Sequence, residues 1–168
     1  MTPKILEYED KRVKVTAQAY AIPEIKAILD KYDMKAEPYL TYIHAMSALD
    51  SPYVNVSEED RQEAVIYDIV AVFGEFDWQD ETVSNAVEKL KSLYTGPMTA
   101  LALEAKEELH RLRRWLKNTP YGDEENVKTR IGLLKDIEKV GTSYNKLLED
   151  AKKEQKPDTK GDHETGSY

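Results

Sequence analysis

The chain has no cysteine among its 168 residues. Disulfide bonds, thiol catalysis and thiolate metal sites are therefore excluded. Long apolar runs are also lacking, because no stretch approaches the roughly 20 apolar residues that cross a bilayer. The first residues, MTPKILEYEDKRVKV, have no apolar segment of the kind found in a secretory signal. We therefore expect a soluble protein, made and used in the cytoplasm, without membrane association.

Positive charge is in short supply. The 24 Lys and Arg residues face 32 Asp and Glu residues, and the formal net charge is −8. Nucleic-acid binding relies on Lys and Arg to neutralise phosphates, so this balance disfavours a nucleic-acid partner. It favours solubility and a partner with a basic surface.

Catalytic signatures are also missing. The sequence contains no G-x-x-x-x-G-K-[ST], no G-x-G-x-x-G and no G-x-S-x-G. Glu107 and His110 form one Glu-x-x-His pair, which is half of a di-iron site, but no second copy exists. His44 is expected at the edge of the core, and His163 has no partner by sequence. We predict no catalytic, cofactor-binding or metal-binding residue and no cofactor. A metal-dependent helical-bundle enzyme using Glu107 and His110 remains the weaker alternative.

Helical periodicity dominates what is present. Apolar residues recur at steps of three and four in segments that begin near Pro23, Pro38, Asp80 and Pro97. We predict an all-α fold, a small helical bundle over residues 21–121. A β-like arm or hairpin of residues 1–20 precedes it. A long helix over residues 122–155 and a polar tail of residues 156–168 follow it.

Residues 51–78 hold the most apolar predicted helix. Ser57 is a suitable N-cap with Asp60 three residues later, and Gly74 is a suitable residue to end the helix. Its apolar face is broad and comprises Val65, Ile66, Ile69, Val70 and Phe73. We expect this helix to lie at the centre of the core.

The two ends differ from the middle. Val13 and Val15 alternate with polar residues, which is the pattern of a strand. Two interpretations of this arm stay open: it packs on the helices of its own chain, or it adds to a neighbouring subunit. In the last helix, Gly141 costs about 1 kcal/mol relative to alanine, which leaves both a continuous helix and a kink or break open. The tail has the composition of a disordered segment.

Residues 110–117 carry the main concentration of positive charge, with Arg111, Arg113 and Arg114 beside Trp115. In order of preference, this cluster is a solvated helix face, a protein interface or a nucleic-acid contact. Eleven tyrosines also favour interfaces, where this residue type is enriched. The interface candidates are Tyr8, Val13, Val15, Arg111, Arg113, Arg114, Trp115, Tyr144 and Tyr168.

Several segments together resemble a known group of proteins. These are KILEYED-x-RVKVT, IPEIKAI, SPYVNVSEEDRQEAVIYDI, W-x-D-E-x-V-x-x-A-V-x-K and GPMTALALEAKEEL, which span most of residues 1–120. The chain is similar in them to small helical virion proteins of tailed bacteriophages, including crAss-like phages of gut Bacteroidetes. The residues that carry the resemblance are Ser51, Pro52, Tyr53, Arg61, Trp78, Ala86, Pro97 and Leu101.

The resemblance implies a structural component of the virion and not an enzyme. The expected part is a head–tail connector or ring protein of the neck, which oligomerises with identical subunits and bridges portal and tail proteins. Such a protein would be assembled in the host cytoplasm and reside in the virion. The alternative is a capsid-associated or packaged acidic module that binds another protein.

Overall fold

The computed structural model describes residues 5–9 and 12–155. It is all-α, as predicted, with 75% of the described residues in helices and one small two-stranded sheet among them. The described elements in chain order are β1 (Leu6–Glu9), β2 (Arg12–Val15), the 3₁₀ turn η1 (Ala19–Ala21), α1 (Pro23–Tyr32), η2 (Asp33–Lys35), α2 (Glu37–Ser47), α3 (Glu58–Phe73), α4 (Glu81–Tyr94), α5 (Pro97–Asn118) and α6 (Glu124–Gln155).

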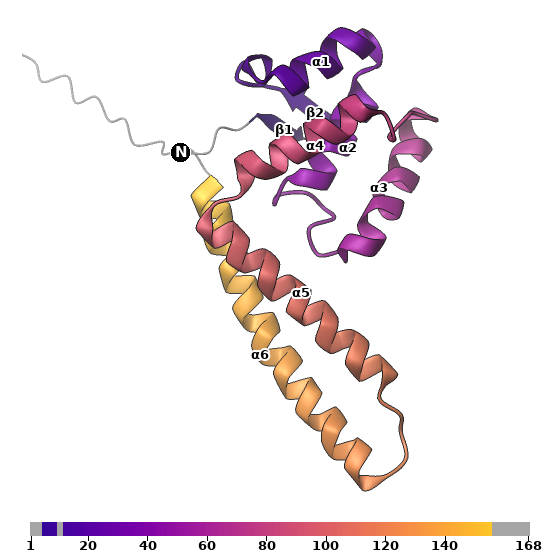
Figure 1. The fold of residues 1–168 in the computed structure, drawn as a ribbon, viewed down its shortest axis with the longest axis vertical. Coiled ribbons are helices and arrows are strands. Elements are labelled where there is room, and N and C mark those ends of the chain that lie inside the picture. The colour runs from indigo at the N-terminus through magenta and orange to yellow at the C-terminus, as the bar shows by residue number, and fades with distance from the viewer. Residues whose placement is uncertain (1–4, 10–11, 156–168) are drawn as a thin grey trace, which may run out of the picture.

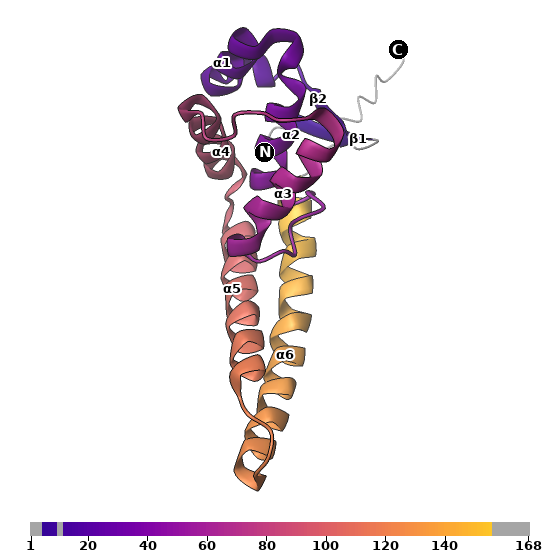
Figure 2. The same cartoon turned by 90° about the vertical axis from the view of Figure 1, so that its right-hand side faces the viewer.

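Two parts make up the molecule. The two strands and helices α1 to α4 form a head, from which α5 and α6 project as a long antiparallel hairpin (Figure 1). The turned view in Figure 2 shows the two helices of the hairpin side by side along its whole length. The long C-terminal helix is therefore packed against residues 97–118. None of the described helices is both long and apolar enough to cross a membrane.

Local signals set the helix boundaries where the sequence predicts them. Ser57 Oγ accepts a hydrogen bond from the Asp60 amide (3.3 Å), which caps α3 at its start. Gly74 ends the same helix with φ +85°, a conformation that suits glycine. Asp80 Oδ1 caps α4 by accepting from the Thr82 amide (2.8 Å). Pro97 lies in the first turn of α5, where its missing amide hydrogen is not needed.

The centre of the head core is α2 and not α3. Every residue of α2 from Tyr39 to Met46 is buried, because α3, α4 and the β-hairpin pack around this helix. In α3, by contrast, Val65 and Ile69 are the buried apolar residues, and Val70 is 37% exposed. The prediction that α3 is central is wrong, because its principal neighbour is α2 and its other side faces outward.

The β-hairpin packs on its own chain, which is one of the two interpretations left open. β1 and β2 are antiparallel, with Leu6 opposite Val15 and Tyr8 opposite Val13. Leu6 and Val13 are buried in the head core, and Tyr8 and Val15 pack against it half-buried.

A second, smaller apolar core joins the hairpin to the head. Leu49 and Val54, from the loop before α3, pack with residues near the base of α5 and α6. α6 runs unbroken through Gly141, so the helix does not end or restart at this glycine. A Cβ at that position would lie 3.9 Å from Leu109 Cδ1, which is an ordinary packing distance.

Candidate interaction surfaces

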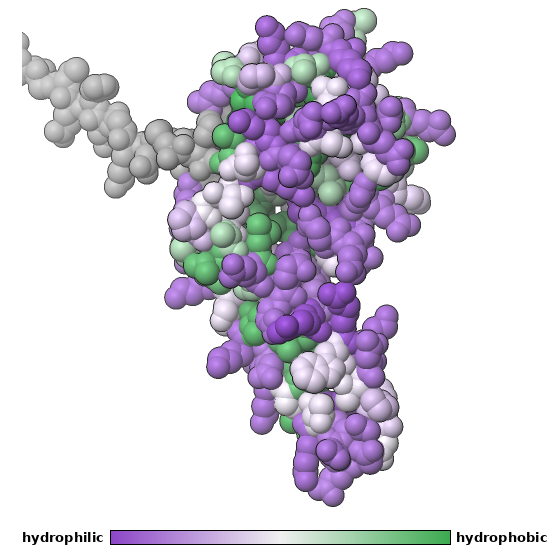
Figure 3. Space-filling model, in the orientation of Figure 1, coloured by the Kyte–Doolittle hydropathy of each residue, from purple (hydrophilic) through white to green (hydrophobic). Residues whose placement is uncertain are grey.

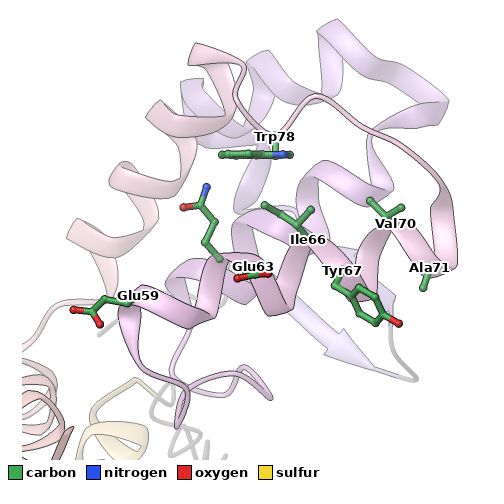
Figure 4. Close-up of a pocket in the computed structure, with 8 residues that line it drawn as sticks. Glu59, Glu63, Ile66, Tyr67, Val70, Ala71 and Trp78 are labelled. Atoms are coloured by element: carbon green, nitrogen blue, oxygen red, sulfur yellow. The ribbon is translucent and has the colours of Figure 1, made fainter. Parts of the chain in front are cut away.

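An open groove follows the outward side of α3. It has a volume of about 650 Å³ and lies between α3 and the loop that carries Trp78 (Figure 4). The α3 residues of its lining recur at three- and four-residue spacing, so they form one stripe along the helix. We call this surface the α3 groove, and its lining is Glu59, Gln62, Glu63, Ile66, Tyr67, Val70, Ala71 and Trp78.

The floor of the α3 groove is apolar and uncovered. Tyr67 is 76% exposed and Val70 37% exposed, while Ile66 and Trp78 are half-buried. In Figure 4 the Trp78 ring stands over α3 and faces Ile66 across the opening. A continuous apolar surface of this kind on a protein marks a site of interaction.

The wall that holds Trp78 is fixed by packing. The indole lies beside Tyr42 of α2, with ring centroids 6.5 Å apart. Phe76 meets Tyr39 edge to face at 5.5 Å, and the Asp77 amide donates to the Tyr39 hydroxyl (3.4 Å). The groove is therefore formed before any partner arrives, which lowers the entropy lost on binding.

Negative charge surrounds the groove. Residues 57–80 contain eight acidic residues and a single basic one, Arg61. Arg61 is buried on the opposite side of α3, where its Nε donates to the Ala45 carbonyl (3.0 Å). Glu59 and Glu63 stand exposed in the groove lining itself. The groove thus presents an apolar floor within an acidic rim.

A second uncovered apolar surface lies at the far end of the hairpin. Val127, Ile131 and Leu134 of α6 are 47%, 48% and 54% exposed. Their spacing of four and three residues places them on one side of the helix, next to the side that packs on α5. We call these three residues the distal stripe.

Positive charge accompanies the distal stripe. Lys128, Lys135 and Lys139 follow at steps of seven and four, so they form a row along the solvent side of the stripe. The α6 residues around the stripe, 123–139, hold four basic and five acidic residues, and Lys128 is paired with Glu124 at 2.7 Å, so the positive charge is confined to this one side of the helix. In Figure 3, hydrophobic side chains gather where the hairpin leaves the head and continue down it as a narrow band.

A charge cluster around the half-exposed Glu58 connects the head to the hairpin. The Glu58 carboxylate lies 3.2 Å from Lys91 Nζ, 3.9 Å from Lys106 Nζ and 4.0 Å from Arg61. Burial opposes ionisation of Glu58, but these three cations outweigh it and lower its pKa. Lys106 is 2% exposed, and its ammonium has no hydrogen-bond partner within the described chain. Burial, with Arg61 nearby, lowers the pKa of Lys106.

One residue of the predicted basic cluster, Arg114, forms an ion pair with the head. Arg114 Nη1 binds Glu59 Oε1 at 3.1 Å, and Arg111 pairs with Glu108 on its own helix at 2.7 Å. Arg113 lines a cavity of about 270 Å³ between α5 and the start of α3. Trp115 is 59% exposed.

The remaining predicted interface candidates are less accessible. Val13 is buried, and Tyr8 and Val15 are half-buried in the head. Tyr8 stacks on His44 with ring centroids 5.5 Å apart. Tyr144 is buried between the hairpin and the head, and its hydroxyl donates to Asn55 Oδ1 (2.9 Å). Within one subunit, therefore, the chain itself covers the interface candidates Val13 and Tyr144.

Two predicted features fall in the tail. Tyr168 and His163 lie outside the described residues, as does the rest of the segment from residue 156. His110 is half-buried beside Lys106, and burial followed by that charge lowers its pKa. Within residues 5–9 and 12–155, no group of three or more His, Asp or Glu side chains could hold a metal ion.

The sequence interpretation overlooked the α3 groove. It assigned Ile66 and Val70 to the core because they extend the apolar side of α3. The sequence did contain a signal. Residues 57–80 are strongly acidic, and a helix rich in acidic residues is more often a surface helix.

Comparisons with known proteins identify no relative of this chain. No family model, curated protein or solved structure matches the chain.

Proposed function

We propose that this chain is a structural protein of a tailed-bacteriophage virion, namely a head–tail connector or ring component of the neck. It forms a homo-oligomer, bridges portal and tail proteins, and acts without catalysing a reaction. It is assembled in the host cytoplasm and resides in the virion. The observation that carries the proposal is the presence of two uncovered apolar surfaces on different parts of one subunit: the α3 groove with its acidic rim, and the distal stripe beside a row of lysines.

Two different surfaces are what a ring requires. A ring grows through heterologous contacts, in which one face of a subunit meets a different face of the next. The α3 groove belongs to the head and the distal stripe to the end of the hairpin. A subunit of this shape presents one surface at each end, which supports a repeating contact. The resemblance of residues 1–120 to small virion proteins supplies the phage assignment.

A second candidate function follows from the acidic rim of the groove. A capsid-associated or packaged module would use Glu59, Glu63 and the apolar floor to hold a basic helix of another protein. This function requires no contact between identical subunits.

The location of the protein in the particle tests the proposal. Virions of the phage that encodes the chain would be purified and labelled with an antibody against it. We expect a fixed number of copies per particle and label confined to the junction of head and tail. Absence from purified virions would refute the proposal, and label within the capsid would favour the packaged module.

A further inference from the structure

We infer that the distal stripe of one subunit docks into the α3 groove of the next subunit. The inference rests on the proposed function, because it names the contact by which identical subunits would assemble. It commits to a second copy of this chain as the occupant of the groove.

The two surfaces agree in length and periodicity. From Glu59 to Ala71 the groove follows twelve residue steps of α3, or about 18 Å at 1.5 Å per residue. From Val127 to Leu134 the stripe spans seven steps, or about 10 Å. The stripe therefore fits within the groove. Anchors at i, i+4 and i+7 are the spacing with which an amphipathic helix enters an apolar groove.

Charge sets the orientation of the docked helix. The groove rim carries Glu59 and Glu63, of which Glu59 is paired with Arg114. The stripe is flanked by Lys128, Lys135 and Lys139, of which Lys128 is paired with Glu124. Among the described residues, Glu63, Lys135 and Lys139 have no ion-pair partner within the chain, so they are available to a neighbour. Pairs at an exposed rim contribute about 0.2–1 kcal/mol each. The apolar contact thus supplies most of the affinity, while the charges steer and align it.

A subunit does not fill its own groove. Arg114 of α5 binds Glu59, which fixes the near end of the groove against the hairpin. The stripe lies beyond this point, because Arg130 of α6 donates to the carbonyls of Leu116 and Thr119 at the end of α5. Figure 1 shows α3 running along the side of the head, away from the far end of the hairpin, and the groove follows this helix from Glu59 to Ala71. Groove and stripe of one chain therefore lie apart, and only another copy brings them together.

A mixing experiment tests the pairing. In the groove variant, Tyr67→Arg and Val70→Arg place two cations opposite the lysine row. In the stripe variant, Ile131→Glu places an anion opposite the acidic rim. Each variant alone would be measured by size-exclusion chromatography with light scattering, at the concentration where the wild type assembles. The two would then be mixed in equal amounts.

We expect each variant alone to be a monomer and the mixture to be a dimer. The groove variant still has an intact stripe, which docks into the intact groove of the stripe variant, and both remaining surfaces are blocked. Matched controls are Val72→Arg, 71% exposed on α3 but outside the groove lining, and Thr129→Glu, exposed on α6 away from the stripe. Both controls should assemble like the wild type. Circular dichroism and thermal unfolding establish that every variant is folded.

The other outcomes separate this inference from the proposed function. If the wild type and both variants form the same oligomer, the pairing is wrong and the oligomeric function stands. If folded variants are monomeric but their mixture also stays monomeric, the two surfaces do not meet each other and the pairing is again wrong. If the wild type is a monomer at every concentration, the ring function itself fails, and a groove that binds a basic helix of another protein takes its place.

Discussion

Lys106 is the most unusual side chain of the molecule. Its ammonium is buried between the hairpin and the head, 3.9 Å from Glu58 Oε2, and it has no hydrogen bond to any described residue. The neighbouring Arg61 adds a second positive charge. Burying a charge is costly unless it is paired and hydrogen-bonded, so an apolar side chain of similar volume should stabilise this position, provided that the former partner keeps another cation.

We predict that Lys106→Met raises the free energy of unfolding by about 1–3 kcal/mol. Glu58 retains Lys91 as a partner at 3.2 Å, so the substitution leaves no unpaired carboxylate. Urea denaturation measures the change. Lys106→Ala is the control, because its shorter side chain leaves a cavity and should lower stability instead. A loss of stability in Lys106→Met equal to that of Lys106→Ala would show that the charge itself stabilises the fold.

His44 makes the stability depend on pH. Burial, and Arg61 after it, lowers the pKa of the ring, although Asp50 at 3.4 Å opposes the shift. The folded-state pKa is below the unfolded value, so above pH 6.5 the ring is neutral in both states. As pH falls below 6.5, the unfolded state takes up a proton that the folded state resists, and stability is lost. Because a single proton is involved, the free energy of unfolding changes by at most about 1.4 kcal/mol per pH unit.

Urea denaturation between pH 7 and pH 5 checks this prediction. We expect wild-type stability to fall over this range and His44→Phe, which keeps the stack on Tyr8 but cannot titrate, to lose less. His110→Gln is the comparison, since His110 is only half-buried and also has a lowered pKa. The His110→Gln variant should keep more of the wild-type pH dependence of stability than His44→Phe does. Equal slopes in wild type and His44→Phe would remove His44 as the cause.

Helix ends respond to local sequence, and two glycines show how. Gly74 ends α3 at φ +85° and ψ −172°, a region that residues with a Cβ rarely occupy. Gly132 lies inside α6 on an exposed face, and a Cβ there would meet nothing within 4 Å. The same substitution should therefore have opposite effects at these two positions.

We predict that Gly74→Ala lowers the free energy of unfolding by about 1–3 kcal/mol through backbone strain. Gly132→Ala should raise it by about 0.5–1 kcal/mol, because alanine favours the helix and restricts the unfolded chain. Thermal and urea unfolding of the two variants measure both effects. If both substitutions changed the free energy of unfolding in the same direction, the backbone conformation at the two glycines would not explain their effects.

The elements also show what sequence can predict. Ser57, Gly74 and Pro97 act within a few residues of themselves, so the helix boundaries they set follow from sequence. Burial depends on which elements become neighbours in space. The apolar side of α3 therefore gave the wrong centre for the core, and Val127, Ile131 and Leu134 read as ordinary packing positions. The candidate site escaped notice for the same reason, since both of its surfaces are apolar sides that the fold leaves uncovered.

At the scale of the whole molecule, the proposed contact between groove and stripe implies a repeating assembly. The head carries an acidic apolar groove, and the hairpin carries an apolar stripe with a lysine row at its far end. If each stripe enters the groove of the next subunit, every subunit makes two equivalent contacts. The assembly then closes into a ring when the rotation between neighbours permits, and otherwise continues as a filament.

The mass of the native assembly tests this account most directly. Native mass spectrometry of the purified chain over a range of concentrations would determine it. We predict one closed species of three or more subunits, each of 19.3 kDa, with the same subunit number at every concentration that supports assembly. A monomer throughout, or a dimer that never grows, would contradict a head-to-tail contact between two different surfaces.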